Sequence, residues 1–224
     1  ELGGIGMCGD GGNPLFYDSG LDAIKREDGH GIGIIKPREN HKIMEMAKRA
    51  KEVGAVAAGV DVDGAGLVTM ALMGQPVGPK NRKELEEIIS SVDLPFILKG
   101  IMTVEEAKIA EEVGASAIVV SNHGGRVLDS TPGVADVLPD IAREISGKIT
   151  ILADGGVRRG VDVLKYLALG ADAVLVGRPI IVGAFGDGRD GVKLVLETMA
   201  NELKQAMILT GCSDLKSIDS SILA

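Results

Sequence analysis

The segment Glu111-Glu-Val-Gly-Ala-Ser-Ala117 occurs twice more in related form, as Lys51-Glu-Val-Gly-Ala-Val-Ala57 and Leu167-Ala-Leu-Gly-Ala-Asp-Ala173. In each copy a helical pattern precedes the glycine and a short apolar run follows it, so the glycine fits the left-handed C-cap of a helix. The three glycines stand 60 and 56 residues apart, and each interval has room for two βα units of about 30 residues. Repetition at this period favours a (β/α)₈ barrel over an open sheet.

Outward from this repeat, apolar runs alternate with helical segments along the chain. The runs are continuous, which is typical of parallel strands buried on both faces. We predict seven strands, at Ile5–Gly9, Gly31–Lys36, Ala55–Asp61, Pro95–Lys99, Ala117–Ser121, Thr150–Asp154 and Ala173–Gly177. Helices are predicted at Asn40–Val53, Asn81–Ser91, Val104–Val113, Gly133–Ile145, Gly160–Leu169 and Asp190–Leu209. Because the barrel needs eight strands, either one strand is hidden or the first βα unit precedes Glu1.

Two segments interrupt the regular order. Residues 64–79 are long for a βα connection, and we expect either a mobile binding loop or an extra short helix packed against the barrel. Residues 183–191 are expected to form a second loop in front of the last helix. Since no interdomain linker is visible, we expect residues 1–224 to form a single domain.

The composition excludes several classes of protein. With 45% hydrophobic and 25% charged residues the chain is globular. A net charge of −8 and only 2% aromatic residues argue against a nucleic-acid groove. No apolar run approaches the about 18 residues of a membrane span. Cys8 and Cys212 show neither metal-type spacing nor a pairing pattern, so we expect a reduced cytoplasmic compartment and no metal.

Polar residues gather at the carboxyl ends of the predicted strands, where a parallel barrel places its active site. They are Lys36, Asp61 with Asp63, Lys99, Ser121-Asn-His123, Asp154 and Gly177-Arg178. A sequence shaped by stability alone has no need for so many polar groups at one end of a sheet. We therefore interpret the set as functional, with solvated loop residues as the alternative.

Two kinds of motif stand out within this set. In Ser121-Asn-His-Gly-Gly-Arg126 the glycines leave the imidazole accessible to a small molecule, and Arg126 can present its fork to a carboxylate or phosphate. The turns Asp154-Gly-Gly-Val-Arg158 and Gly177-Arg-Pro179 follow the last two strands, where barrels commonly bind phosphate through backbone N–H groups and a helix N-terminus. Tight turns with surface arginines are the alternative interpretation.

Four segments carry a resemblance to a known family: Pro95-Phe-Ile-Leu-Lys-Gly100, Val120-Ser-Asn-His-Gly-Gly-Arg126, Ala153-Asp-Gly-Gly-Val-Arg158 and Val176-Gly-Arg-Pro179. In this order and spacing the sequence resembles the FMN-dependent 2-hydroxy acid oxidases and dehydrogenases of the glycolate and lactate oxidase type, closely over residues 90–215 and loosely before them. The resemblance implies a (β/α)₈ barrel that holds FMN and oxidises an L-2-hydroxy acid to a 2-oxo acid. It also implies oxygen or another electron acceptor, and a homo-oligomer, commonly a tetramer or octamer.

The resemblance also implies roles for single residues. His123 is the base that accepts a proton as two electrons pass to flavin N5, Asp63 stabilises the imidazolium, and Arg126 holds the substrate carboxylate. Lys99 lies near flavin N1 and O2, and Ser121 contacts the isoalloxazine ring. The residues that hold the ribityl chain and phosphate are Asp154, Gly155, Gly156, Arg158, Gly177 and Arg178.

The sequence departs from this family on the substrate side. Ile35-Lys36-Pro37 replaces a Gln-x-Tyr, Asp61 replaces a threonine, and residues 64–79 lack a second substrate arginine. The family's first strand has no counterpart, so we expect the natural chain to begin before Glu1. Two further functions stay open: an FMN barrel isomerase or nucleotide dehydrogenase, which shares the glycine-rich turns but lacks His-Gly-Gly-Arg, and a non-catalytic flavin- or phosphate-binding protein.

Overall fold

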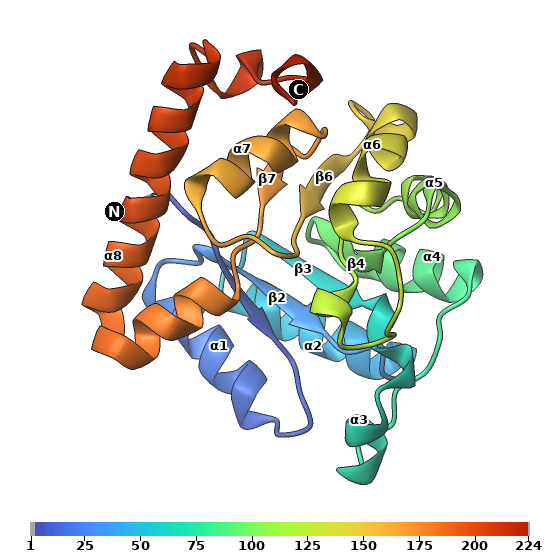
Figure 1. The fold of residues 1–224 in the computed structure, drawn as a ribbon. Coiled ribbons are helices and arrows are strands. Elements are labelled where there is room, and N and C mark those ends of the chain that lie inside the picture. The colour runs from blue at the N-terminus through green and yellow to red at the C-terminus, as the bar shows by residue number, and fades with distance from the viewer. Residues whose placement is uncertain (1–2, 224) are drawn as a thin grey trace.

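The structure is a computed structural model that describes residues 3–223 as a curled parallel sheet with helices on its outer side (Figure 1). The strands are β1 Gly6–Gly9, β2 Gly31–Ile35, β3 Ala57–Asp61, β4 Phe96–Ile101, β5 Ala117–Val120, β6 Thr150–Ala153 and β7 Ala173–Val174. They pair in sequence order, and within residues 3–223 no pairing joins β7 to β1. This arrangement confirms the predicted fold class, a (β/α)₈ barrel lacking one βα unit in this chain. What precedes Glu1 lies outside the described residues.

Eight α-helices are described within residues 3–223. They are α1 Leu15–Arg26, α2 Asn40–Glu52, α3 Val68–Leu72, α4 Arg82–Ser91, α5 Val104–Glu112, α6 Val134–Ile145, α7 Gly160–Ala168 and α8 Arg178–Thr210. Short 3₁₀ turns are η1 Val62–Gly66, η2 His123–Gly125, η3 Leu215–Ser217 and η4 Ser220–Ile222. Among these helices none is long and apolar enough to cross a membrane.

Local sequence sets several helix ends. The side chain of Asn81 accepts from the backbone of Glu84 at 3.0 Å, and that of Thr103 accepts from the backbone of Glu106 at 3.2 Å. In each case the glutamate side chain accepts a hydrogen bond from the backbone N–H of the capping residue, which completes a capping box. The repeat glycines end their helices in the left-handed region, with φ of 83°, 85° and 104° at positions 54, 114 and 170.

Two segments differ from the sequence prediction, and a third decides between two predicted alternatives. Helix α1 fills a stretch for which no helix was expected. Residues 64–79 contain the end of η1 and the short helix α3, of which Met70 is buried, so the extra short helix is present. The prediction of a loop at residues 183–191 is wrong, because these residues belong to α8, which is kinked at Asp187 and Gly188. The glycines mislead here because they serve helix packing: a Cβ on Gly191 would lie 2.1 Å from the carbonyl oxygen of Gly183.

Apolar side chains form two layers around the sheet. The larger cluster packs the outward faces of the strands against the helices, with Ile43, Phe96 and Leu138 almost fully buried. A smaller cluster contains strand residues alone and fills the inside of the barrel: Ile32, Ile34, Ala57, Ile97, Ala117 and Val119, with Met7, Leu152 and Leu175 packed against it. Side chains alternate between these two faces along each strand.

Candidate active site

The inward rows of the barrel continue into the polar residues at its carboxyl end. Two residues beyond Ile34, Ile97, Val119 and Leu152 stand Lys36, Lys99, Ser121 and Asp154, respectively, and Asp61 follows Ala57 in the same register. Because the side-chain period of a strand is two, these polar groups occupy the inward face just above the apolar interior. The sequence therefore places five polar side chains around one barrel mouth.

Lys99 lies at the centre of this group. Its Nζ donates to Ser121 Oγ at 3.0 Å and lies 3.5 Å from Asp61 Oδ1 and 3.6 Å from Asp154 Oδ2. The lysine side chain is 12% exposed, so its ammonium group is largely withdrawn from water and needs these partners. Three strands, β4 and its neighbours β3 and β5, are thereby linked with the loop after β6.

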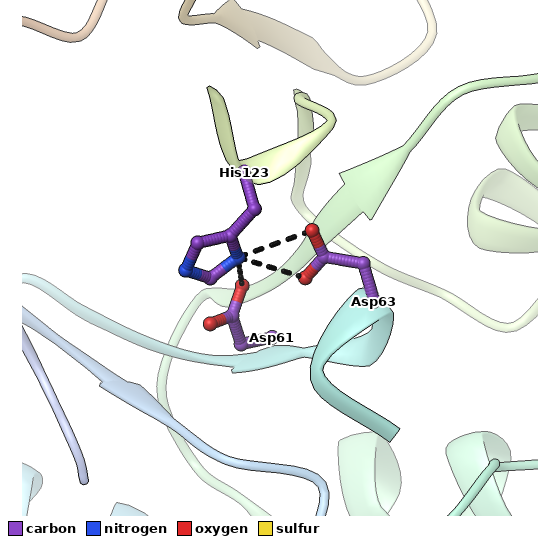
Figure 2. Close-up of side chains that lie close together, drawn as sticks. All are labelled: Asp61, Asp63 and His123. Atoms are coloured by element: carbon purple, nitrogen blue, oxygen red, sulfur yellow. Dashed lines mark hydrogen bonds and ion pairs between the residues drawn. The ribbon is translucent and has the colours of Figure 1, made fainter. Parts of the chain in front are cut away.

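His123 lies beside this group with one ring nitrogen already engaged. Its Nδ1 lies 3.1 Å and 3.3 Å from the two carboxylate oxygens of Asp63 and 3.6 Å from Asp61 Oδ1. In Figure 2 every dashed line to the ring ends at Nδ1, and Nε2 lies on the side of the ring away from Asp63. The neutral ring can donate from Nδ1 and accept at Nε2. The contact expected between His123 and Asp63 is present, while the roles of the two residues stay a prediction.

Two backbone features position this pair. His123 has a φ of 57°, in the left-handed region that a non-glycine residue rarely adopts, and its N–H donates to Ser121 Oγ at 3.1 Å. Gly100 has a φ of 101°, and a Cβ there would lie 2.5 Å from Asp63 Cγ. Glycine at this position therefore leaves the space in which the Asp63 carboxylate meets the imidazole.

Asp61 is the most enclosed acid of the site. Its side chain is 5% exposed, Oδ2 accepts a short contact from Lys36 Nζ, and Lys99 faces Oδ1. Burial by itself raises the pKa of Asp61, but the positive charges of Lys99 and Lys36 outweigh it and hold the pKa below its ordinary value. Asp61 is therefore a carboxylate at neutral pH.

Asp63 shows the opposite behaviour. Burial raises its pKa, the hydrogen bond to His123 lowers it, and the negative charge of Asp61 raises it again, so the pKa lies above its ordinary value.

Asp61, Asp63 and His123 present ligand atoms within 4.8 Å of one another, a spacing that suits a cation. The ammonium groups of Lys36 and Lys99 already balance the charge of Asp61, so the chemistry of the cluster is that of a proton-handling group.

The remaining predicted residues form a cradle at the end of the barrel where β6 and β7 lie. Gly155 and Gly156 have φ of 102° and 70°, and a Cβ on Gly156 or Gly177 would meet nothing within 4 Å. Arg158 and Arg178 both line a hollow of about 420 Å³ whose other walls come from α8, and the three glycines do not line it. Arg178 also reaches across the mouth, where its Nη2 would lie 3.4 Å from a Cβ on Gly124.

This cradle fits a flavin mononucleotide. Open backbone at two glycine turns with two arginines beside them suits a phosphate. Asp154 Oδ1 is buried without a hydrogen-bond partner in the described structure, and a sugar-alcohol hydroxyl would satisfy it. Lys99 supplies a cation beside that carboxylate. Asp154, Gly156, Arg158, Gly177 and Arg178 could therefore hold the ribityl phosphate, with Lys99 and Ser121 along the ring.

Arg126 is not brought into the cluster. Its side chain is exposed, and its Nε donates to the carbonyl oxygen of His123 at 3.1 Å. The guanidinium is thus held beside the catalytic candidate, next to the mouth rather than inside it. A substrate carboxylate that bound at this guanidinium would lie against the His123 turn.

One polar network was missed by the sequence analysis. Arg38 binds Asp10 through two bonds, Nε to Oδ2 at 2.7 Å and Nη2 to Oδ1 at 3.0 Å, and it also contacts the side chain of Gln75. Asp10 Oδ2 accepts from the backbone N–H of Lys36 at 3.1 Å. The network therefore fastens the segment after α3 to the ends of β1 and β2. Asp10 directly follows the first predicted strand, so the strand-end rule applied to Asp10 too could have found it.

Comparison with known proteins agrees with this geometry. A family model described as FMN-dependent dehydrogenase matches residues 25–224. The chain belongs to the FMN-dependent dehydrogenase family.

Proteins similar to this chain include oxidases of 2-hydroxy acids. The chain is 49% identical over 136 residues to a peroxisomal (S)-2-hydroxyacid oxidase of Arabidopsis thaliana, covering 61% of this chain and 38% of that protein. It is 49% identical over 140 residues to an L-lactate oxidase of Nostoc sp., covering 62% and 38%. A crystal structure of mandelate oxidase superposes with a TM-score of 0.79 at 30% identity, covering 95% of this chain and 76% of that one. The matches thus span little more than a third of the curated relatives.

Proposed function

We propose that this chain carries the active site of an FMN-dependent oxidoreductase that converts an L-2-hydroxy acid to its 2-oxo acid. The observation that supports this most directly is the ring of His123, whose Nδ1 faces the Asp63 carboxylate at 3.1 Å while Nε2 is left for a ligand. The relatives named as hydroxyacid and lactate oxidases support the same substrate class.

His123 would accept the substrate's proton at Nε2. As the ring becomes an imidazolium, the Asp63 carboxylate stabilises the new charge and fixes the ring orientation through Nδ1–H. Bound FMN supplies the acceptor for the substrate's two electrons. Lys99, at 3.0 Å from Ser121 Oγ, would hold its ammonium group beside the flavin ring and balance negative charge there.

The substrate carboxylate would bind at Arg126, which the His123 carbonyl holds beside the mouth. The Asp154, Gly155, Gly156 and Arg158 turn and the Gly177–Arg178 turn would hold the ribityl phosphate. We further propose a single FMN-binding domain, oxygen or another electron acceptor, a homo-oligomer such as a tetramer or octamer, and a cytoplasmic location.

The test is product formation by the FMN-loaded chain. The protein is incubated with L-lactate, glycolate, L-mandelate and longer L-2-hydroxy acids, and 2-oxo acid is detected with a carbonyl reagent. We expect product with at least one acid, and at least 100-fold less with the His123→Gln variant, which keeps a similar side-chain volume without the base.

Two outcomes would contradict the proposal. A chain that binds FMN but yields no 2-oxo acid with any member of the panel would be a flavin-binding protein without this activity. Unchanged turnover in His123→Gln would favour an FMN barrel enzyme of another class, because the proposed base would then have no role.

A further inference from the structure

Asp61 stands where His123 has a second anionic neighbour. Asp61 Oδ1 lies 3.6 Å from His123 Nδ1, the same ring nitrogen that faces Asp63 at 3.1 Å (Figure 2). Asp61 comes from the end of β3 and Asp63 from η1, so two carboxylates approach one imidazole nitrogen from one connection. Asp61 Oδ1 is buried and has no hydrogen-bond partner in the described structure. That oxygen faces both the ring and the Lys99 ammonium group, which lies 3.5 Å away.

Lys36 explains why Asp61 points this way. Its Nζ contacts Asp61 Oδ2, which leaves the other oxygen, Oδ1, on the side of His123 and Lys99. Lys36 is itself fixed, since its backbone N–H donates to Asp10 Oδ2 and Asp10 is bound by Arg38. The backbone of Lys36 is therefore anchored to the ends of β1 and β2, and its ammonium group contacts Asp61 from this fixed position.

Other charges around Asp61 are accounted for. Lys99 faces it from β4, His123 from η2 and Asp63 from η1, while Asp154 shares Lys99 from the far side. The lysines keep Asp61 ionised, whereas Asp63 next to it is the harder of the two carboxyls to ionise. Asp61 would therefore stay negatively charged next to an imidazolium at His123.

We propose that two carboxylates stabilise the imidazolium of His123 at Nδ1: Asp63, and Asp61 as a second counter-ion. Lys36 is the positioning residue that holds Asp61 in place. The inference rests on the proposed function, because it assigns His123 the role of a base. It adds two residues, Lys36 and Asp61, that determine how readily this base takes up its proton.

The test is an NMR titration of the His123 ring in the FMN-saturated, substrate-free protein. The chain has three histidines, and the His123 signals are assigned by their loss in His123→Gln. We expect Asp61→Asn to lower the pH at half-change of these signals by about one unit, the effect of removing an opposite charge at this range. Asp61→Thr should act alike, which guards against a folding defect of one variant. Asp93→Asn removes an exposed carboxylate paired with Lys51 and should change nothing.

The role of Lys36 is tested in the same titration. In a Lys36→Met background we expect Asp61→Asn to shift the half-change pH by less than half of its effect in the parent, and in a Lys36→Arg background by nearly the full amount. Equal shifts in all three backgrounds would remove Lys36 from the proposal. No shift in Asp61→Asn or Asp61→Thr, with a clear shift in Asp63→Asn, would overturn the two-carboxylate arrangement.

This test separates the inference from the proposed function. The ring titration needs no substrate, so a chain that oxidises no hydroxy acid can still show the Asp61 effect. Conversely, if the enzyme is active but its His123 signals titrate unchanged in Asp61→Asn, the proposed function stands and the role of Asp61 is contradicted.

Discussion

Asp63 and His123 stand 60 residues apart in the chain, and their side chains meet at 3.1 Å at the mouth of the barrel. One comes from the turn after β3 and the other from the turn after β5, with β4 and Lys99 between them. The parallel register makes this meeting possible, because all strands end at one rim. An acid, an imidazole and an ammonium group thus come together from three neighbouring strands.

Gly100→Ala should slow flavin reduction by disturbing this pair. The new Cβ would lie 2.5 Å from Asp63 Cγ, so the carboxylate must move away from the imidazole. Gly147→Ala is the matched control, because Gly147 also has a positive φ, of 77°, but nothing lies within 4 Å of the added Cβ. We expect both variants to lose about 1–2 kcal/mol of stability from backbone strain, and only Gly100→Ala to lose at least 10-fold in rate. Equal rates in the two variants would show that the space beside Asp63 is unimportant.

The stability of the protein should respond oppositely to the loss of the two carboxylates. Asp61 has a lowered pKa, so its contribution is present at neutral pH and lost as pH falls through the folded pKa. Asp63 has a raised pKa, so its favourable contribution exists only in acid and is lost as pH rises through the folded value. At neutral pH, Asp61→Asn should lower the free energy of unfolding and Asp63→Asn should raise it.

The measurement is urea unfolding from about pH 7 down to about pH 2, which brackets the ordinary aspartate pKa of about 3.9. The Asp63→Asn difference should shrink as pH falls through the raised pKa of Asp63, whereas the Asp61→Asn difference should shrink only below the ordinary aspartate pKa. Destabilisation by both substitutions at neutral pH would contradict the opposite pKa directions of the two groups.

Arg38→Met should cost about 3 kcal/mol of stability, because it leaves the buried Asp10 carboxylate without its partner. The Arg38 side chain is 6% exposed and that of Asp10 is 1% exposed. Arg82→Met provides the control: it breaks a pair with Glu112 in which both side chains are about half exposed, and should cost at most about 1 kcal/mol. Similar urea midpoints for both variants would mean that the Asp10–Arg38 network does not stabilise the rim.

Arg178→Met should weaken FMN binding by about 10- to 100-fold, the effect of losing one hydrogen bond to a charged group. Riboflavin, which lacks the phosphate, separates a phosphate contact from a ring contact. Quenching of flavin fluorescence should show a large loss for FMN and little change for riboflavin. Equal losses for the two ligands would place Arg178 at the ring rather than at the phosphate.

The fold followed from the sequence where each signal was local. Continuous apolar runs and the glycine after each repeat helix predicted the strands and the left-handed C-caps at 54 and 114. The 183–191 segment failed because its glycines serve a close approach between Gly183 and Gly191, and composition alone does not distinguish that from a loop. Helix α1 was missed in a segment that opens with glycine and proline, Gly11-Gly-Asn-Pro14.

The candidate site could be predicted only in part from the sequence. The strand-end rule names which residues face the mouth, and Lys36 and Asp61 were among them. It does not say which of these side chains touch, because that depends on register and on the space left by a residue such as Gly100. The contact of Lys36 with Asp61 and the approach of Asp61 to His123 therefore needed the structure.

Anaerobic reduction of the bound flavin tests the central claim most directly. The FMN-saturated chain is mixed without oxygen with each L-2-hydroxy acid and with the matching D-enantiomer, and the oxidised flavin absorbance is followed. We predict bleaching by at least one L-2-hydroxy acid, none by its D-enantiomer, and at least 100-fold slower bleaching in His123→Gln. A flavin that stays oxidised with every acid, or that bleaches equally fast without His123, would contradict the assignment of this barrel mouth as a hydroxy acid oxidising site.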